Sequence, residues 1–192
     1  MIQLPECKLI LDKLMNETPA HLFYHNVGHT LDVYESVSTI ATLEGVSQRD
    51  YRLLQVAAIY HDVGYLIERN NSEEHSCEMV KEYLPRFDYS LEEIESICRI
   101  IMATKMPQNP KSHLEEIICD ADLDYIGRAD FFNLSKRLYK EMIVLGTIQN
   151  WKEWIKLQEL FMNQHHYFTA SAIALRQAEK EQNLKIIKSK KS

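Results

Sequence analysis

The segment AAIYHDVGY, residues 57–65, places a histidine and an aspartate at the end of an apolar run. On a helix, His61 and Asp62 would project about 100° apart, yet both side chains could reach one ion lying between their directions. His29 is also expected to face inward, because aliphatic residues follow it at helical steps of four, four and three. A hydrogen-bonded core histidine or an internal ion pair would explain any one of these residues alone.

Asp122 is another polar residue at a position where the pattern predicts burial. It shares a helical face with Ile118 and Ile126, each four residues away. A lone buried carboxylate is costly, so we expect it to cap a helix, to join an ion pair or to bind a metal. Asp120 and Asp124 raise the local negative charge, which favours a cation. We place Asp122 in the site because of its face, and Asp120 is the alternative.

These residues come from three separate segments, and together they favour one metal site over several unrelated polar contacts. Two imidazoles and two carboxylates form a mixed set of nitrogen and oxygen ligands. Such a set suits Mn²⁺, Fe²⁺, Co²⁺, Ni²⁺ or Zn²⁺ and does not suit a thiophilic ion. We therefore predict one divalent transition metal, with Mg²⁺ as the less favoured choice.

The elements that carry these residues are expected to be helices. Five glycines and five prolines among 192 residues allow few turns, and no segment alternates apolar and polar residues for long. Good N-cap residues, Asn26 and Ser47, precede the two histidine segments, and Gly45 separates them. Helices are expected over about 5–18, 26–44, 47–62, 72–84, 90–105, 113–126, 130–146, 149–164 and from 169 onward. The sequence therefore predicts an all-α fold in a single domain, with a core over about 20–130 and a C-terminal helical extension over about 130–188.

Composition narrows the classes of partner. A net charge of −6 argues against a nucleic-acid-binding surface, and the four scattered cysteines predict neither disulfides nor a cysteine zinc site. No apolar run is long enough to span a membrane, and the N-terminal segment lacks the pattern of a signal peptide. We expect a cytoplasmic protein that binds neither nucleic acid nor membrane. Trp151 and Trp154 fit either a homodimer interface or packing among the C-terminal helices, so the oligomeric state stays open.

The order of a histidine, a His–Asp pair and a final aspartate resembles the HD superfamily of metal-dependent phosphohydrolases. YHNVGHTLDV (24–33) looks like the segment with the first histidine of the family, and AAIYHDVGY looks like its signature segment. DADLDYIG (120–127) is similar to the final-aspartate segment of a bacterial subgroup of small HD proteins. The resemblance covers about residues 20–130 and implies an HD-domain helical bundle with additional C-terminal helices. It implies the metal ligands His29, His61, Asp62 and Asp122.

By the same resemblance, the expected reaction is hydrolysis of a small phosphorylated substrate, and we expect a nucleotide. Four protein ligands around a six-coordinate ion would leave room for a water and a phosphate oxygen, and a metal-bound water would attack phosphorus. Asp62 could also accept the proton of that water, as the family implies. Whether the enzyme is a phosphatase, a pyrophosphatase or a phosphodiesterase stays open. The alternative function is a catalytically silent sensor module that keeps the site to bind metal or nucleotide.

Further residues are candidates for catalysis and substrate binding. Glu73 and Glu74 lie beyond the signature segment and could orient water or assist proton transfer, although solvated glutamates in a first helical turn would give the same pattern. Lys105 and Arg128 are the candidate partners of the phosphate, although each also fits an ordinary surface cation. His25 lies one helical turn before the first histidine ligand, so it could contact the substrate or the metal-bound water, or occupy a helix cap.

The expected number of metal ions follows from the residues between the His–Asp pair and the last aspartate. HD relatives with a second metal often carry a histidine pair where this chain has MATK, residues 102–105. Thr104 and Lys105 cannot replace imidazole ligands, so we expect a single metal. This expectation disfavours a cyclic-dinucleotide phosphodiesterase and a di-iron oxygenase.

Overall fold

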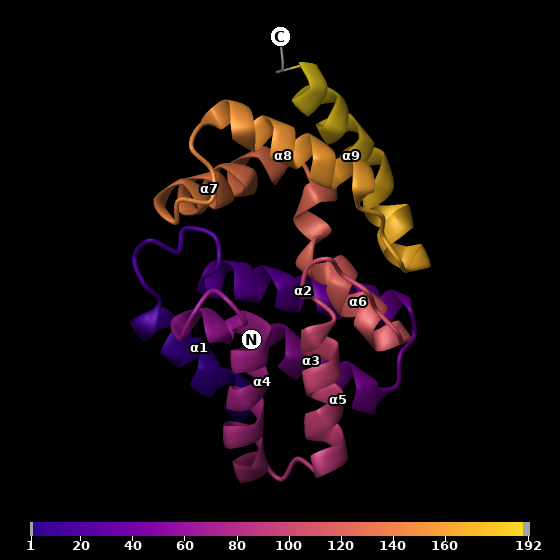
Figure 1. The fold of residues 1–192 in the computed structure, drawn as a ribbon. Helices are drawn as coiled ribbons and strands as arrows, with labels where there is room; N and C mark the ends of the chain where they lie inside the picture. Colours follow the sequence, from indigo (N-terminus) through magenta and orange to yellow (C-terminus); the bar gives the residue numbers. More distant parts are fainter. Residues whose placement is uncertain (1, 190–192) are drawn as a thin grey trace.

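The computed structural model describes residues 2–189, and in this part of the chain it contains nine α-helices, three short 3₁₀ helices and no strand (Figure 1). The α-helices are α1 (Pro5–Glu17), α2 (Val27–Leu43), α3 (Gln48–Tyr60), α4 (Ser72–Tyr83), α5 (Leu91–Met102), α6 (His113–Asp122), α7 (Phe131–Val144), α8 (Trp151–Gln164) and α9 (Ala170–Ser189). The 3₁₀ helices are η1 (Val63–Leu66), η2 (Leu84–Phe87) and η3 (Asp124–Gly127). The all-α fold predicted from the scarcity of turn-forming residues is confirmed. Within residues 2–189, no helix combines the length and apolar character needed to cross a bilayer.

Polar side chains fix the starts of several helices. Five residues accept a hydrogen bond from a backbone N–H in the turn that follows them: Asn26, Ser47, Ser90, Ser112 and Asn150. Ser90 also forms a capping box with Glu93. Gly45 follows α2 with a φ of +66°, in the left-handed region that glycine adopts without a steric penalty. The helix boundaries near the two histidine segments therefore follow from local sequence.

Helix α3 is the central helix of the bundle formed by α1–α6. It packs against α1, α2, α4, α5 and α6, and residues 56–60 are completely buried. This burial comes from small and aliphatic side chains on all sides of its last turn. Because the chain leaves α3 at Tyr60, the next two residues, His61 and Asp62, begin inside the bundle.

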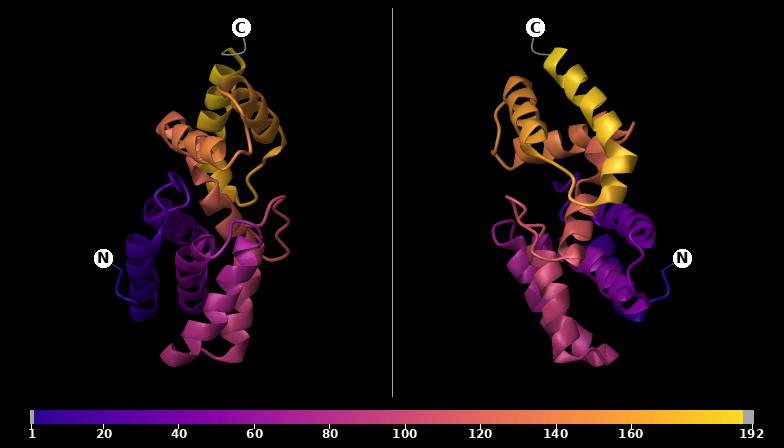
Figure 2. Two further views of the ribbon diagram at one scale, coloured as in Figure 1. Left: turned by 60° about the vertical axis from the view of Figure 1, so that its left-hand side comes forward. Right: turned by 90° about the vertical axis from the view of Figure 1, so that its right-hand side faces the viewer.

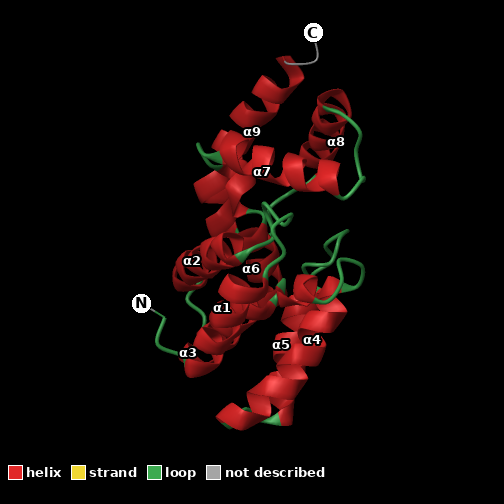
Figure 3. Ribbon diagram, turned by 90° about the vertical axis from the view of Figure 1, so that its left-hand side faces the viewer, coloured by secondary structure: helices red, strands yellow, loops and turns green. Residues whose placement is uncertain are grey.

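The last three helices form a second layer at one end of this bundle (Figures 1 and 2). Helix α9 packs on η3 and α8, and it also reaches α2. The Asp120 carboxylate accepts hydrogen bonds from the backbone N–H of Phe168 (2.9 Å) and of Thr169 (2.8 Å), just before α9. The Asn183 amide of α9 donates to the carbonyl of Ile126 at 3.1 Å. Several loops lie between the two layers, and Figure 3 shows them in green.

The two helices that precede ligand candidates at their C-terminal ends stop earlier than the sequence predicted. We expected one helix to run through His61 and Asp62, but α3 ends at Tyr60 and Asp62 has φ −108° and ψ 5°. The expected helix over 113–126 ends at Asp122, and the chain continues as η3. Both expectations were wrong because buried apolar residues continue through the 3₁₀ helices, so the hydrophobic pattern does not reveal the break.

Gly64 allows a close contact between η1 and helix α4. It lies within η1, and a Cβ atom added there would lie 1.9 Å from the carbonyl oxygen of Ser72. Only glycine therefore allows η1 to contact the first turn of α4 directly. This contact holds the turn after the His–Asp pair against α4.

Candidate metal centre

The four residues expected to bind metal converge where three helices meet. His29 lies in the first turn of α2, His61 and Asp62 follow α3, and Asp122 is the last residue of α6. The Nε2 atom of His29 lies 3.1 Å from Asp122 Oδ1 and 3.3 Å from Asp62 Oδ2. The Nε2 atom of His61 lies 3.3 Å from that of His29, 3.2 Å from Asp62 Oδ2 and 3.6 Å from Asp122 Oδ1. The structure thus brings the two imidazoles and the two carboxylates together.

Hydrogen bonds outside the cluster orient its members. The Nδ1 atom of His61 donates to the carbonyl of Ala58 at 2.8 Å, so its Nε2 atom faces the cluster. The hydroxyl of Ser76, on α4, donates to the carbonyl of His61 at 2.8 Å and accepts from the N–H of Gly64 at 2.9 Å. Ser76 therefore fixes the turn after α3 from a neighbouring helix. Sequence analysis missed this residue, because a serine inside a helix carries no distinguishing signal.

The donor atoms fit a metal ion in both spacing and bonding. Nitrogen or oxygen ligands about 2.0–2.2 Å from one ion lie about 3 Å apart, which is close to the observed separations. The Oδ2 atom of Asp62 is buried and accepts no hydrogen bond from the described residues. The two imidazole nitrogens, 3.3 Å apart, can share only one proton between them. One divalent cation would satisfy the orphaned oxygen and both nitrogen lone pairs.

Charge within the cluster also favours a cation. Burial lowers the pKa of His29, but the neighbouring carboxylates of Asp122 and Asp62 outweigh burial and raise that pKa to about 9. Burial also lowers the pKa of His61, but the negative charge of Asp62 outweighs burial and raises the pKa of His61 well above the usual value. Burial would raise the pKa of Asp122, but its contacts with His29 and His61 lower it. The two carboxylates therefore stabilise positive charge at this site. Protons on the imidazoles provide that charge here, and a bound metal cation would take their place.

Asp120, the alternative to Asp122, does not join the cluster. Its carboxylate accepts from the N–H groups of Phe168 and Thr169 and from the Thr169 hydroxyl, the last at 2.8 Å. Burial raises the pKa of Asp120 to about 6 despite these hydrogen bonds. Its function in the fold is to attach the start of α9 to α6.

The other predicted charged residues have partners away from the four ligand candidates. The carboxylate of Glu74 forms an ion pair with Lys105, and Glu73 accepts a hydrogen bond from the Ser72 hydroxyl at 3.2 Å. The sequence alone could not distinguish this ion pair from a catalytic glutamate and a separate phosphate-binding lysine. The roles suggested for Glu73, Glu74 and Lys105 therefore stay predictions without geometric support.

Arg128 is held by three carboxylates. Its guanidinium donates to both oxygens of Asp32, at 2.8 and 2.9 Å, and also to Asp130 at 3.0 Å and to Asp124 at 3.3 Å. Burial alone would lower the pKa of Arg128, but the carboxylates of Asp32 and Asp130 outweigh burial and raise that pKa above its usual value. This arrangement occupies the donors that a phosphate would need, so it argues against the substrate-binding role suggested for Arg128.

His25 is held beside the cluster by a residue of the C-terminal layer. Its Nδ1 atom forms an ion pair with the buried carboxylate of Glu141, on α7. Glu141 also accepts from the backbone N–H of Tyr24 at 2.8 Å and of His25 at 3.1 Å. The His25 ring stacks on Tyr65 with centroids 4.2 Å apart. Sequence analysis missed Glu141, although a glutamate in the stripe after Leu138 was an available signal.

A cavity of about 420 Å³ adjoins the ligand cluster. Asp122 and Tyr24 line it near the cluster, with His25, Tyr65 and Arg69 beside them. Arg69 was missed as well, because it belongs to an exposed polar loop. Its guanidinium donates to the Thr147 hydroxyl at 2.6 Å, and it has no ion pair with a carboxylate within residues 2–189.

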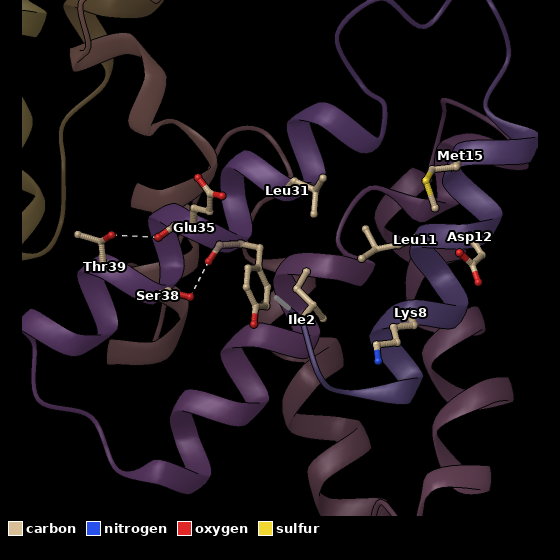
Figure 4. A pocket seen from close by; sticks show the side chains of 10 residues that line it. Ile2, Lys8, Leu11, Asp12, Met15, Leu31, Glu35, Ser38 and Thr39 are labelled. Carbon is tan, nitrogen blue, oxygen red and sulfur yellow. Dashed lines mark hydrogen bonds between the residues drawn. The ribbon is translucent and has the colours of Figure 1, made fainter.

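A larger hollow of about 750 Å³ lies elsewhere, between α1 and α2 (Figure 4). Its lining includes Lys8, Asp12 and Glu35, and it contains none of the residues predicted to bind metal or substrate. Figure 4 shows polar side chains of α1 and α2 around a few aliphatic residues. Of these two cavities, only the smaller one is lined by residues predicted for the site, namely Asp122 and His25.

Comparisons with known proteins agree with this geometry. A model of the HD domain family matches residues 26–124, slightly more than half of the chain, and that span contains all four ligand candidates. A comparison with curated proteins gave no significant match. Among solved structures, the crystal structure of a predicted HD superfamily hydrolase from an uncultured Thermotogales bacterium is similar, with a TM-score of 0.64 and 18% sequence identity. The alignment covers 97% of this chain and 90% of that chain, so the C-terminal helices belong to the shared fold. The chain therefore belongs to the HD domain family.

Proposed function

We propose that this protein is a metal-dependent phosphohydrolase that acts on a small phosphorylated molecule. The observation that carries the proposal is the convergence of four polar side chains beside a cavity of about 420 Å³. The two imidazole Nε2 atoms lie 3.3 Å apart, and each lies 3.1–3.6 Å from a carboxylate oxygen of Asp62 and of Asp122. A structural cluster would have no need of an adjoining cavity, whereas a reactive centre must admit a substrate.

The ligands would be His29, His61, Asp62 and Asp122, and the ion would be one of Mn²⁺, Fe²⁺, Co²⁺, Ni²⁺ or Zn²⁺. When bound, such an ion would make a water molecule more acidic and would withdraw charge from a phosphoryl group. Asp62 is also the proposed acceptor of the proton that water gives up, through the carboxylate oxygen that the metal would leave free.

Two residues beside the cluster would contact the substrate. Glu141 holds the Nδ1 side of His25, which leaves the Nε2 side for an oxygen of the substrate. Arg69 lines the cavity without a carboxylate partner within residues 2–189, so its guanidinium is the proposed contact of the phosphate oxygens. It takes the role that sequence analysis gave to Lys105 and Arg128.

The experiment that tests the proposal is a screen for phosphate and pyrophosphate release. Nucleoside mono-, di- and triphosphates and non-nucleotide phosphate esters would each be incubated with Mn²⁺, Co²⁺ and Mg²⁺. We expect metal-dependent turnover that Asp122→Asn removes, because this substitution takes a charged ligand from the cluster. Metal binding without turnover of any ester would instead support the catalytically silent sensor module.

A further inference from the structure

We infer that the organic group of the substrate is predominantly apolar and lies in the cavity between the ligand cluster and helices α7 and α8. This inference rests on the proposed phosphohydrolase function and narrows its substrate class to alkyl or aryl phosphate esters. It departs from the nucleotide that the family resemblance suggested.

The wall opposite the ligand cluster is built from apolar side chains of the C-terminal layer. Leu138 and Met142 come from α7, and Leu157 and Phe161 come from α8. Leu157 is 38% exposed although it lines a cavity. Contact with an apolar group would remove this surface from water, which is favourable in proportion to the area buried.

The polar groups on this wall bind one another. The amide nitrogen of Gln158 donates to the Ser135 hydroxyl at 2.5 Å, and the indole N–H of Trp154 donates to the same oxygen at 3.3 Å. Both side chains are buried, so these hydrogen bonds satisfy groups that line the cavity. A nucleobase and its ribose carry several donors and acceptors, which would lose water here with few new partners. An alkyl or aryl group carries no such cost.

The polar and apolar linings come from different parts of the fold. Asp122, His25 and Arg69 belong to the α1–α6 bundle and its loops, whereas the apolar side chains Leu138, Met142, Leu157 and Phe161 belong to α7 and α8. A volume of about 420 Å³ falls in the usual range of small-molecule sites. A phosphate ester with an apolar group matches this division, with phosphate toward the cluster.

Ties to the bundle hold the apolar wall in place. Glu141 of α7 accepts hydrogen bonds from the backbone at residues 24 and 25, next to the cavity. Asp120, two residues before a ligand, holds the chain segment that leads into α9. The C-terminal layer is thereby positioned relative to the ligand cluster, as a specificity-determining surface requires.

The first test measures binding without turnover. Trp151→Phe leaves Trp154, which lines the cavity, as the remaining tryptophan of the two in the chain. In this background we expect n-hexylphosphonate, which cannot be hydrolysed, to change the Trp154 fluorescence saturably and at a much lower concentration than methylphosphonate. Equal concentration dependence for the two phosphonates would overturn the inference.

The second test measures kcat/KM for linear alkyl phosphates from methyl to hexyl, with adenosine monophosphate beside them. The alkoxide leaving groups are of similar basicity, so the series reports contact of the chain with the protein. We expect kcat/KM to rise about fourfold for each methylene that enters the cavity, the ratio that burial of one methylene gives. A flat series, or adenosine monophosphate preferred over hexyl phosphate, would overturn the inference.

A matched pair of variants locates the effect. Leu157→Asn introduces a polar group of similar size into the cavity wall, and Leu160→Asn makes the same change at a 56% exposed position of α8 outside the cavity. We expect Leu157→Asn to lower the ratio of kcat/KM for hexyl to methyl phosphate about tenfold, with no change for Leu160→Asn. Equal ratios in both variants would contradict the assigned wall.

The two tests separate failure of this inference from failure of the proposed function. Binding of hexylphosphonate to Trp154 without hydrolysis of any ester would support the apolar cavity and contradict the phosphohydrolase. Hydrolysis of esters without dependence on chain length would support the phosphohydrolase and overturn the apolar substrate class.

Discussion

Replacement of His29 by glutamine distinguishes a metal ligand from a core histidine. His29 is 8% exposed, and its Nε2 atom lies 3.1 Å from Asp122 and 3.3 Å from Asp62. Glutamine keeps a polar side chain of similar reach but does not supply the imidazole nitrogen. We therefore expect the His29→Gln variant to retain its helical content and to bind divalent metal much more weakly.

The size of the effect follows from mass action. Metal at a hundredfold excess over its dissociation constant stabilises the folded protein by about 2.7 kcal/mol. For a protein of this size, about 1 kcal/mol shifts Tm by roughly 2–4 °C, so the gain in Tm is about 5–11 °C. If the lost ligand weakens binding about a hundredfold, the same metal concentration stabilises by only about 0.4 kcal/mol, and the gain falls to roughly 1 °C.

The assay is a thermal melt followed by circular dichroism, with and without Mn²⁺ or Co²⁺. The matched control is His113→Gln, because His113 is 47% exposed and pairs with Glu44 and Glu116 outside the cluster. The control should keep the full metal-dependent gain in Tm. If His29→Gln melts at a lower temperature but keeps that full gain, His29 is a core hydrogen-bonding residue and the proposed ligand set is wrong.

Asp62→Ala should abolish both metal binding and hydrolysis, whereas Glu73→Ala and Glu74→Ala should retain metal binding in isothermal titration. Equal loss of metal binding in all three variants would show that the proposed ligand set is wrong. Arg69→Gln should raise KM for a phosphate ester about tenfold or more while metal affinity stays the same, and an unchanged KM would remove Arg69 from the phosphate site. Burial lowers the pKa of His165 to about 3, so this side chain stabilises the fold above its unfolded pKa of about 6.5 and loses that stability as the pH falls toward 3. In urea unfolding, the wild type should therefore lose about 2 kcal/mol more stability than His165→Phe between pH 7 and pH 5. Identical losses in the two proteins would contradict this assignment.

The sequence predicted the helices and the ligand cluster because both depend on local pattern. Asn26 and Ser47 are caps that a few neighbouring residues specify, and the stripe after His29 shows which way its imidazole faces. The breaks after Tyr60 and Asp122 escaped prediction, because the 3₁₀ helices that follow are as buried as the α-helices before them.

The surroundings of the cluster depend on contacts that no local pattern encodes. Arg128 was suggested as a phosphate contact because it is a cation just after the final-aspartate segment. Its bidentate partner Asp32 lies 96 residues away in the sequence, so local pattern could not reveal this ion pair. His25 and Glu141 are separated by 116 residues, so their ion pair became visible only when α7 was placed against the bundle. The apolar cavity likewise requires the relative position of α6, α7 and α8, which the hydrophobic periodicity of each helix leaves open.

The central claim is that His29, His61, Asp62 and Asp122 hold a divalent metal, and anomalous diffraction from crystals grown with Mn²⁺ or Co²⁺ tests it most directly. The account predicts one anomalous peak per chain, between the two Nε2 atoms and the two carboxylates; each Nε2 atom lies 3.1–3.6 Å from an oxygen of both carboxylates. A crystal that contains the metal elsewhere, or a peak beside Asp120 with none between the two imidazoles, would contradict it.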